Sequence, residues 1–219
     1  MFNLIEQMSH IMSNKILKLT ILCLFLLSSC ATTTMVDRTV KFNKNKVLST
    51  ISAVDSSYNQ LESLLYVDIK SQNMYLLKKG TILKGFKVSS SYYGTGSEVN
   101  SLKTPLGKHE IYKKIGKDLP INAILKGRVW NGAIANVITE DIDTDFDHVT
   151  SRILWLDGLE IGKNKGSGVD SRSRYIYIHG TAEEGLIGRP ASDGCIRMYN
   201  NDVIDLFDLV NEKVQVWIY

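Results

Sequence analysis

The chain has 219 residues, of which 44% are apolar and 22% are charged, and its formal net charge is +3. This length suits one buried domain with extensions, because most domains run to roughly 100–200 residues. So small a charge, without a block of Lys or Arg, excludes a strongly basic nucleic-acid-binding protein, and no nucleic-acid partner is expected.

The N-terminus has the pattern of an export signal. A basic stretch precedes an apolar run over residues 19–27, which is short of the roughly 20 residues that span a bilayer. The run ends in LSSC, which resembles the bacterial lipobox and makes Cys30 the lipidated first residue of the mature protein. We therefore predict a lipoprotein signal peptide over residues 1–30, with Met1 or Met12 as the start. An ordinary secretory peptide with an incidental Cys30 is the alternative.

Two further features follow this signal. Ala31, directly after the lipidated cysteine, resembles the outer-membrane sorting pattern of diderm bacteria. It predicts an exported protein that contacts the membrane through its N-terminal lipid, at the periplasmic face of the outer membrane. Residues 31–61 are rich in Thr, Ser, Asn and Lys, which predicts a tether with a short helix around 47–61.

The remaining residues, 62–219, form the predicted domain. Residues 116–152 look loop-rich, and so long a connection is usually functional or partly structured. Residues 200–213 predict a helix with an Asn cap and one apolar face. Residues 104–107, TPLG, suit a type I turn. Strands are expected over 64–69, 73–80, 82–91, 108–115, 152–161, 174–180 and 213–219. The fold is therefore predicted to be mainly β.

One of the three cysteines is expected to remain as a thiol in the mature protein. Cys23 lies in the signal core and Cys30 carries the lipid, so Cys195 alone remains and no intramolecular disulfide can form. No CxxC or HxxxH spacing accompanies it, so no metal site is expected. An unpaired thiol in an oxidising compartment is a liability unless it is buried or used. Packing as a small hydrophobe and catalysis both stay open.

A nucleophilic cysteine needs a base nearby. His10 is lost with the signal, His109 is expected to be an exposed or half-buried strand residue, and His148 lies in a solvated acidic stretch. His179 ends a predicted strand and precedes Gly180, a place from which a side chain can project into a cleft.

The residues around the cysteine suit the same chemistry. Gly194 leaves room for a substrate carbonyl beside backbone N–H groups. Arg197 would lie on the same side of an extended chain as Cys195 and could hold a carboxylate.

These residues carry a family resemblance. The segment YIHGTAEEGLIGRPASDGCIRMYNNDVIDLF resembles the signature of the L,D-transpeptidase catalytic (YkuD-type) family, His-Gly and then Ser-x-Gly-Cys-aliphatic-Arg. His179 and Cys195 are 16 positions apart, and Ser192, Gly194 and Arg197 match the second part. The segment KTPLGKHEI resembles the family's upstream Thr-Pro-x-Gly element. The resemblance covers about residues 62–219.

One residue departs from the pattern. Many members have His where this chain has Asp193, and a carboxylate beside a thiol should raise the thiol pKa unless a cation compensates. We expect Asp193 to interact with Arg197 or with a substrate amine, which leaves His179 to deprotonate Cys195.

The resemblance implies an L,D-transpeptidase-like β-sandwich with a short C-terminal helix near the active-site cleft. It also implies a cysteine acyltransferase that cleaves the bond between the L-centre of a peptidoglycan tetrapeptide stem and its terminal D-alanine. The acyl group would pass to an amine of a second stem, forming a 3–3 crosslink, or to a wall-attached lipoprotein. An L,D-carboxypeptidase, a hydrolase that releases wall-bound protein, and a non-catalytic wall-binding lipoprotein are the alternatives.

The resemblance also implies roles for individual residues. Cys195 would be the nucleophile and His179 the general base, then acid. Supporting roles, including the oxyanion hole, fall to Gly194, Gly180 and Asp193, and substrate positioning to Arg197 and Ser192. No metal or organic cofactor is expected.

Overall fold

The computed structural model describes residue 38 and residues 40–219. The predicted signal peptide over residues 1–30, with its lipidation site Cys30, lies outside the described residues. Within the described part, no helix is long and apolar enough to cross a membrane.

The described residues form ten strands, two α-helices and two short 3-10 helices. The strands are β1 (Ser63–Asp68), β2 (Asn73–Lys78), β3 (Thr81–Ser89), β4 (Gly107–Ile115), β5 (Ala123–Lys126), β6 (Val129–Ile134), β7 (Val149–Gly158), β8 (Tyr177–Thr181), β9 (Ile196–Met198) and β10 (Gln215–Ile218). The helices are α2 (Lys44–Val54), η1 (Ser56–Gln60), η2 (Glu184–Leu186) and α3 (Asn200–Leu209). The prediction of a mainly β fold with a C-terminal helix is confirmed.

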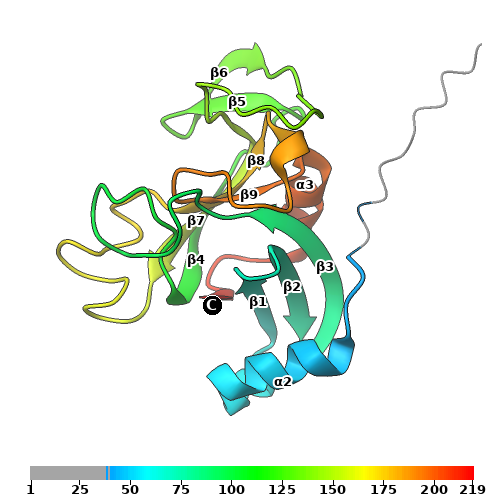
Figure 1. Cartoon of the computed structure of the whole chain (residues 1–219), viewed down its shortest axis with the longest axis vertical. Helices are drawn as coiled ribbons and strands as arrows, with labels where there is room; N and C mark the ends of the chain where they lie inside the picture. Colours follow the sequence, from blue (N-terminus) through cyan, green and yellow to red (C-terminus); the bar gives the residue numbers. More distant parts are fainter. Residues whose placement is uncertain (1–37, 39) are drawn as a thin grey trace, which may run out of the picture. The chain divides into compact units, whose positions relative to one another are not determined.

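The sheet closes on itself. Its strand order is β4-β10-β1-β2-β3-β9-β8-β7-β5-β6, and β4 also pairs with β7, so every strand except β5 and β6 belongs to a closed ring. The β1–β10 and β8–β9 pairs are parallel and the others antiparallel. Closure leaves the ring without free edges. In Figure 1, the β5–β6 hairpin lies at one end of this unit and α2 at the other.

The ring surrounds the main apolar core, and α3 packs into it. Val203 and Leu206 of α3 are fully buried against inward-facing strand residues such as Ile178 and Ile196. The predicted Asn cap of this helix is wrong, because its N-cap residue is Tyr199, which makes no side-chain cap bond. The Asn200 amide is used elsewhere: it donates to the Thr181 carbonyl at 2.7 Å.

A second apolar cluster lies outside the ring, beneath α2. Ile51 of α2 is fully buried and packs with Leu64, Tyr66 and Trp217, among others. The Asn43 side chain begins the helix by accepting a hydrogen bond from the Lys46 N–H. The short helix expected around 47–61 is present but begins and ends earlier, at Lys44–Val54, and it packs an apolar face against the domain.

The 116–152 segment is more ordered than the sequence predicted. It contains the β5–β6 hairpin, and β7 begins already at Val149. Every residue of β6 is exposed, so this strand lacks the alternation of apolar and polar residues that identifies a half-buried strand. The predicted turn over residues 104–107 is also wrong, because the chain does not turn at residues 105 and 106, and the Thr104 carbonyl accepts the Gly96 N–H rather than the Gly107 N–H.

His109 is another correction, since it is fully buried rather than exposed or half-buried. Its ring nitrogens lie 3.0 Å from the Gly107 carbonyl oxygen and 2.9 Å from the Ser171 hydroxyl. Burial lowers the pKa of His109 to about 4. This histidine therefore packs as a satisfied neutral side chain.

Candidate active site

The catalytic candidates lie on two adjacent parallel strands. His179 of β8 pairs in register with Arg197 of β9, and Cys195 directly precedes β9. Because Ile178 and Ile196 point into the core, their neighbours face the outside of the ring. The fold thus brings Cys195, His179 and Arg197 together on one face of the sheet.

Two backbone groups hold the Cys195 sulfur. The Tyr177 N–H donates to Sγ at 3.3 Å, and the thiol donates to the Tyr175 carbonyl at 3.5 Å. Burial raises the pKa of the Cys195 thiol to about 12, and the Asp147 carboxylate adds to the rise. The Cys195 thiol is therefore neutral at rest and would need a base to become a thiolate.

His179 has the properties of that base. It is 1% exposed, and its Nδ1 lies 2.7 Å from the Gly180 carbonyl oxygen. Since a carbonyl can only accept, Nδ1 carries the proton and Nε2 of the neutral ring keeps its lone pair. Burial lowers the pKa of His179, although Asp147 opposes the change. His179 is therefore neutral near pH 7 and able to accept the thiol proton.

Gly180 supports this arrangement through its size as well as its carbonyl. A Cβ at this position would come 2.5 Å from Asn200 Oδ1 and 2.9 Å from the Thr150 carbonyl oxygen. A larger residue would thus displace the strand end that carries His179.

Ser192 and Gly194 build the loop that presents the nucleophile. The Ser192 hydroxyl, fully buried, donates to the Cys195 carbonyl at 2.6 Å and accepts the Gly194 N–H at 3.3 Å. The structure therefore places Ser192 within the protein rather than at a substrate-contacting surface. Among the described residues, the Gly194 N–H has this partner while the Cys195 N–H has none. The Cys195 N–H is the donor left for an oxyanion.

Arg197 is held differently from the prediction. Its side chain is 3% exposed and forms ion pairs with Glu183 at 2.8 Å and with Asp147 at 3.0 Å. Asp193 forms no ion pair with Arg197 in the described structure: Asp193 is solvent-exposed, and the guanidinium is already engaged by two other carboxylates. The expected interaction of Asp193 with a substrate amine stays a prediction. Partial burial raises the pKa of the Asp193 carboxyl, and the negative charge of Asp147 raises it further.

Sequence reasoning missed the partners of this arginine. Glu183 is 1% exposed, and its second oxygen accepts hydrogen bonds from both the N–H and the hydroxyl of Thr144 at 2.6 Å. Thr144 and Asp147 belong to the acidic stretch for which the sequence predicts a solvated loop. The density of carboxylates in TEDIDTDFD was the one available signal, and it does not reveal which carboxylate turns inward.

An aromatic wall lies next to the thiol. The Arg128 guanidinium, from the β5–β6 turn, lies 4.7 Å from the Trp155 ring centre and 4.9 Å from that of Tyr175. It also donates to the Tyr177 hydroxyl at 3.1 Å. The two tyrosines are the ones whose backbone groups contact Cys195. The site therefore combines a thiol, a base and a half-buried cation.

No group of three or more His, Cys, Asp or Glu side chains is arranged to hold a metal ion within residues 40–219. The neutral Cys195 thiol, the neutral His179 imidazole on the adjacent strand and the Cys195 N–H donor form a site suited to acyl transfer.

Residues 62–218 match the model of the YkuD family, the L,D-transpeptidase catalytic domain. This match covers well over half of the chain, which therefore belongs to the L,D-transpeptidase catalytic domain family. An enzyme of this kind is thus supported by both the family match and the site.

Individual relatives match over shorter stretches. YkuD and YqjB of Bacillus subtilis (strain 168), whose names describe them as L,D-transpeptidases, are 47% identical over 49 residues and 44% identical over 52 residues. These matches span 22% and 23% of this chain, and 30% and 28% of the relatives. The solved L,D-transpeptidase from Mycobacterium smegmatis is 15% identical with a TM-score of 0.46, covering 72% of this chain and 58% of that one.

Proposed function

We propose that this protein is a peptidoglycan L,D-transpeptidase that works through a thioester on Cys195. The observation that carries the proposal is that the neutral Cys195 thiol and the neutral His179 imidazole lie on one face of two adjacent strands. The Gly180 carbonyl fixes the imidazole tautomer so that Nε2 can take the thiol proton.

The first half-reaction is acylation. His179 Nε2 takes the proton from Cys195 Sγ, and the sulfur attacks the carbonyl carbon at the L-centre of a tetrapeptide stem. The oxyanion that forms accepts a hydrogen bond from the Cys195 N–H. The imidazolium then gives its proton to the departing nitrogen, and the C–N bond breaks. D-alanine is released, and the rest of the stem stays bound to Cys195 as a thioester.

The second half-reaction returns the enzyme to its resting state. His179 takes a proton from the acceptor amine, whose nitrogen attacks the thioester carbonyl. A C–N bond forms, the C–S bond breaks, and the proton passes back to the sulfur. A second stem or a wall-attached lipoprotein supplies this amine, whereas water in its place would give carboxypeptidase activity.

A lipid on Cys30 would hold the enzyme beside its insoluble polymer, on the periplasmic face of the outer membrane. The lipobox-like LSSC and the following Ala31 support this placement. Labelling cells with an alkyne fatty acid and fractionating their membranes tests it, and Cys30→Ala should lose both the label and the membrane association.

The activity itself is tested by acylation and by product analysis. A carbapenem should add its mass to the wild-type protein and leave Cys195→Ala unmodified, as read by intact mass spectrometry. With tetrapeptide stems, wild type should form crosslinked dimers and release D-alanine. An absent adduct would contradict the enzyme, and tripeptide without dimers would contradict the transferase in favour of a hydrolase.

A further inference from the structure

Thr104 of the TPLG motif lies buried beneath the nucleophile loop, and every polar atom it has is used. Its N–H donates to the Gly94 carbonyl at 3.0 Å, and its carbonyl accepts the Gly96 N–H at 2.9 Å. Its hydroxyl oxygen accepts the Ser91 N–H at 2.9 Å and donates to the Gly194 carbonyl at 3.0 Å. Thr104 is 0% exposed, so water does not compete for these bonds.

The hydrogen bond from the Thr104 hydroxyl to the Gly194 carbonyl fixes the direction in which the Cys195 N–H points. The Gly194 carbonyl and the Cys195 N–H belong to one peptide unit, and in a planar trans peptide they point in opposite directions. A hydroxyl that holds the carbonyl inward therefore turns the N–H to the opposite side. Hydrogen bonding at the carbonyl also polarises the peptide and makes its N–H a better donor.

Without such a bond this peptide would be free to turn. Gly194 has a φ of 119°, in the region that favours glycine. On the far side of the nucleophile, the Cys195 carbonyl is held by the Ser192 hydroxyl. Both peptides that flank Cys195 are thus held by buried hydroxyl groups.

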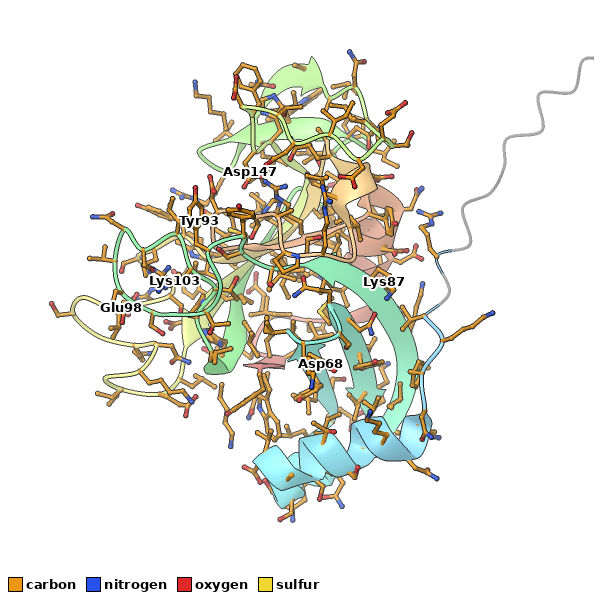
Figure 2. The ribbon with its side chains drawn as sticks, viewed as in Figure 1. Asp68, Lys87, Tyr93, Glu98, Lys103 and Asp147 are labelled. Atoms are coloured by element: carbon orange, nitrogen blue, oxygen red, sulfur yellow. The ribbon has the colours of Figure 1, made fainter. Side chains whose placement is uncertain are left out.

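The segment that carries Thr104 is itself attached to the nucleophile loop. Ser91 forms a parallel bridge with Ser192, and the Tyr92 N–H donates to the Ser192 carbonyl at 3.0 Å. In Figure 2, Tyr93 and Lys103 are labelled near the two ends of this segment, between β3 and β4. The support for the Cys195 N–H is therefore supplied by the protein itself.

We propose that Thr104 is a positioning residue, which aims the Cys195 N–H at the oxyanion that forms during acylation. This role rests on the proposed function, because it requires a carbonyl substrate. Thr104 acts through the Gly194–Cys195 peptide and does not touch the substrate.

The test compares two reactions of the same sulfur. Acylation by a carbapenem passes through an oxyanion, whereas alkylation by iodoacetamide does not. Thr104→Val keeps the shape and removes the hydroxyl, so it should slow acylation about tenfold to a hundredfold, somewhat less than loss of a donor itself. Its alkylation rate should equal that of wild type, and Thr104→Ser, which keeps the hydroxyl, should recover most of the acylation rate.

Thr150→Val is the matched control, because Thr150 is an equally buried threonine whose hydroxyl bonds to Asn200 at 2.6 Å. It should lower the melting temperature without changing the ratio of acylation to alkylation. Unchanged acylation in Thr104→Val, or an equal loss of both reactions, would overturn the proposal. If Thr104→Val does not fold, Thr104→Ala removes the same hydroxyl and is judged by the same ratio. A wild-type protein that is not acylated would instead overturn the proposed function.

Discussion

Two outer faces of one closed sheet have opposite characters. The face formed by β1, β2 and β10 is covered by α2 and is largely apolar, with Ile51 and Trp217 almost completely buried. The face formed by β7, β8 and β9 carries the thiol, the imidazole and the guanidinium of the candidate site. The first face stabilises the fold by burying apolar surface. On the second face the buried polar side chains form hydrogen bonds and ion pairs with one another, and these contacts give the site its geometry.

The largest effect on activity should come from removing the base on the second face. Wild-type acylation should be constant between about pH 7 and 9, since the thiol and the imidazole are then both neutral. It should fall only at a pH below the ordinary histidine pKa, as His179 becomes protonated, because burial lowers the pKa of this histidine. His179→Gln should lower the rate at pH 7 by about 10²–10⁴-fold. In this variant the rate should rise with pH, because the thiolate of a group with pKa about 12 becomes the reacting species.

Stopped-flow acylation across this pH range makes the measurement, with iodoacetamide alkylation as an independent report of the thiolate. An alkylation plateau that persists at pH 5 would show a thiolate–imidazolium pair at rest and contradict the neutral pair.

A smaller effect should follow from removing the negative charge beside Arg197. Glu183→Gln keeps an oxygen for Thr144 but leaves the guanidinium with Asp147 as its one remaining carboxylate. With one carboxylate fewer beside it, the Arg197 guanidinium repels the imidazolium form of His179 on the adjacent strand more strongly. Acylation should therefore slow by about tenfold. Breaking a buried pair should also cost about 3 kcal/mol of unfolding free energy.

Arg189→Gln is the matched control for Glu183→Gln. It removes the exposed pair of Arg189 with Asp141, which joins the same two segments, and should cost less than about 1 kcal/mol with no change in acylation. Urea denaturation and acylation rates make the comparison. If the two variants lose the same free energy of unfolding and react at the same rate, the buried pair of Glu183 with Arg197 contributes no more than the exposed pair, and the prediction is contradicted.

The smallest effect on activity should come from the apolar face. Ile51→Ala leaves a cavity in a fully buried cluster and should lower the free energy of unfolding by about 2–5 kcal/mol. Its acylation rate below the melting temperature should match wild type, because this cluster touches none of the site residues. Exposed Thr50→Ala on the same helix is the control and should leave both quantities nearly unchanged. A loss of acylation in Ile51→Ala at a temperature where the variant is folded would show that the two faces are coupled.

Most strands could be predicted from the sequence because they alternate or form dense β-branched and aromatic runs. The exceptions have local causes. Strand β9 is three residues long, β6 is exposed on both faces, and α2 carries the polar composition of a tether on all but one narrow face. Each is stabilised by contacts with residues distant in the chain, which no local pattern contains.

The sequence by itself identified the candidate nucleophile and the candidate base, since elimination of the other cysteines and histidines left Cys195 and His179, and their spacing resembles that of the family. It also identified the two motifs around them. Only the tertiary structure decided how the rest of the site is used: Arg197 is enclosed by carboxylates, Ser192 is turned inward, and Thr104 reaches across 90 residues to the Gly194 carbonyl. The reason is physical, because a residue's type fixes which bonds it can form, whereas the closed sheet decides which partners lie within reach.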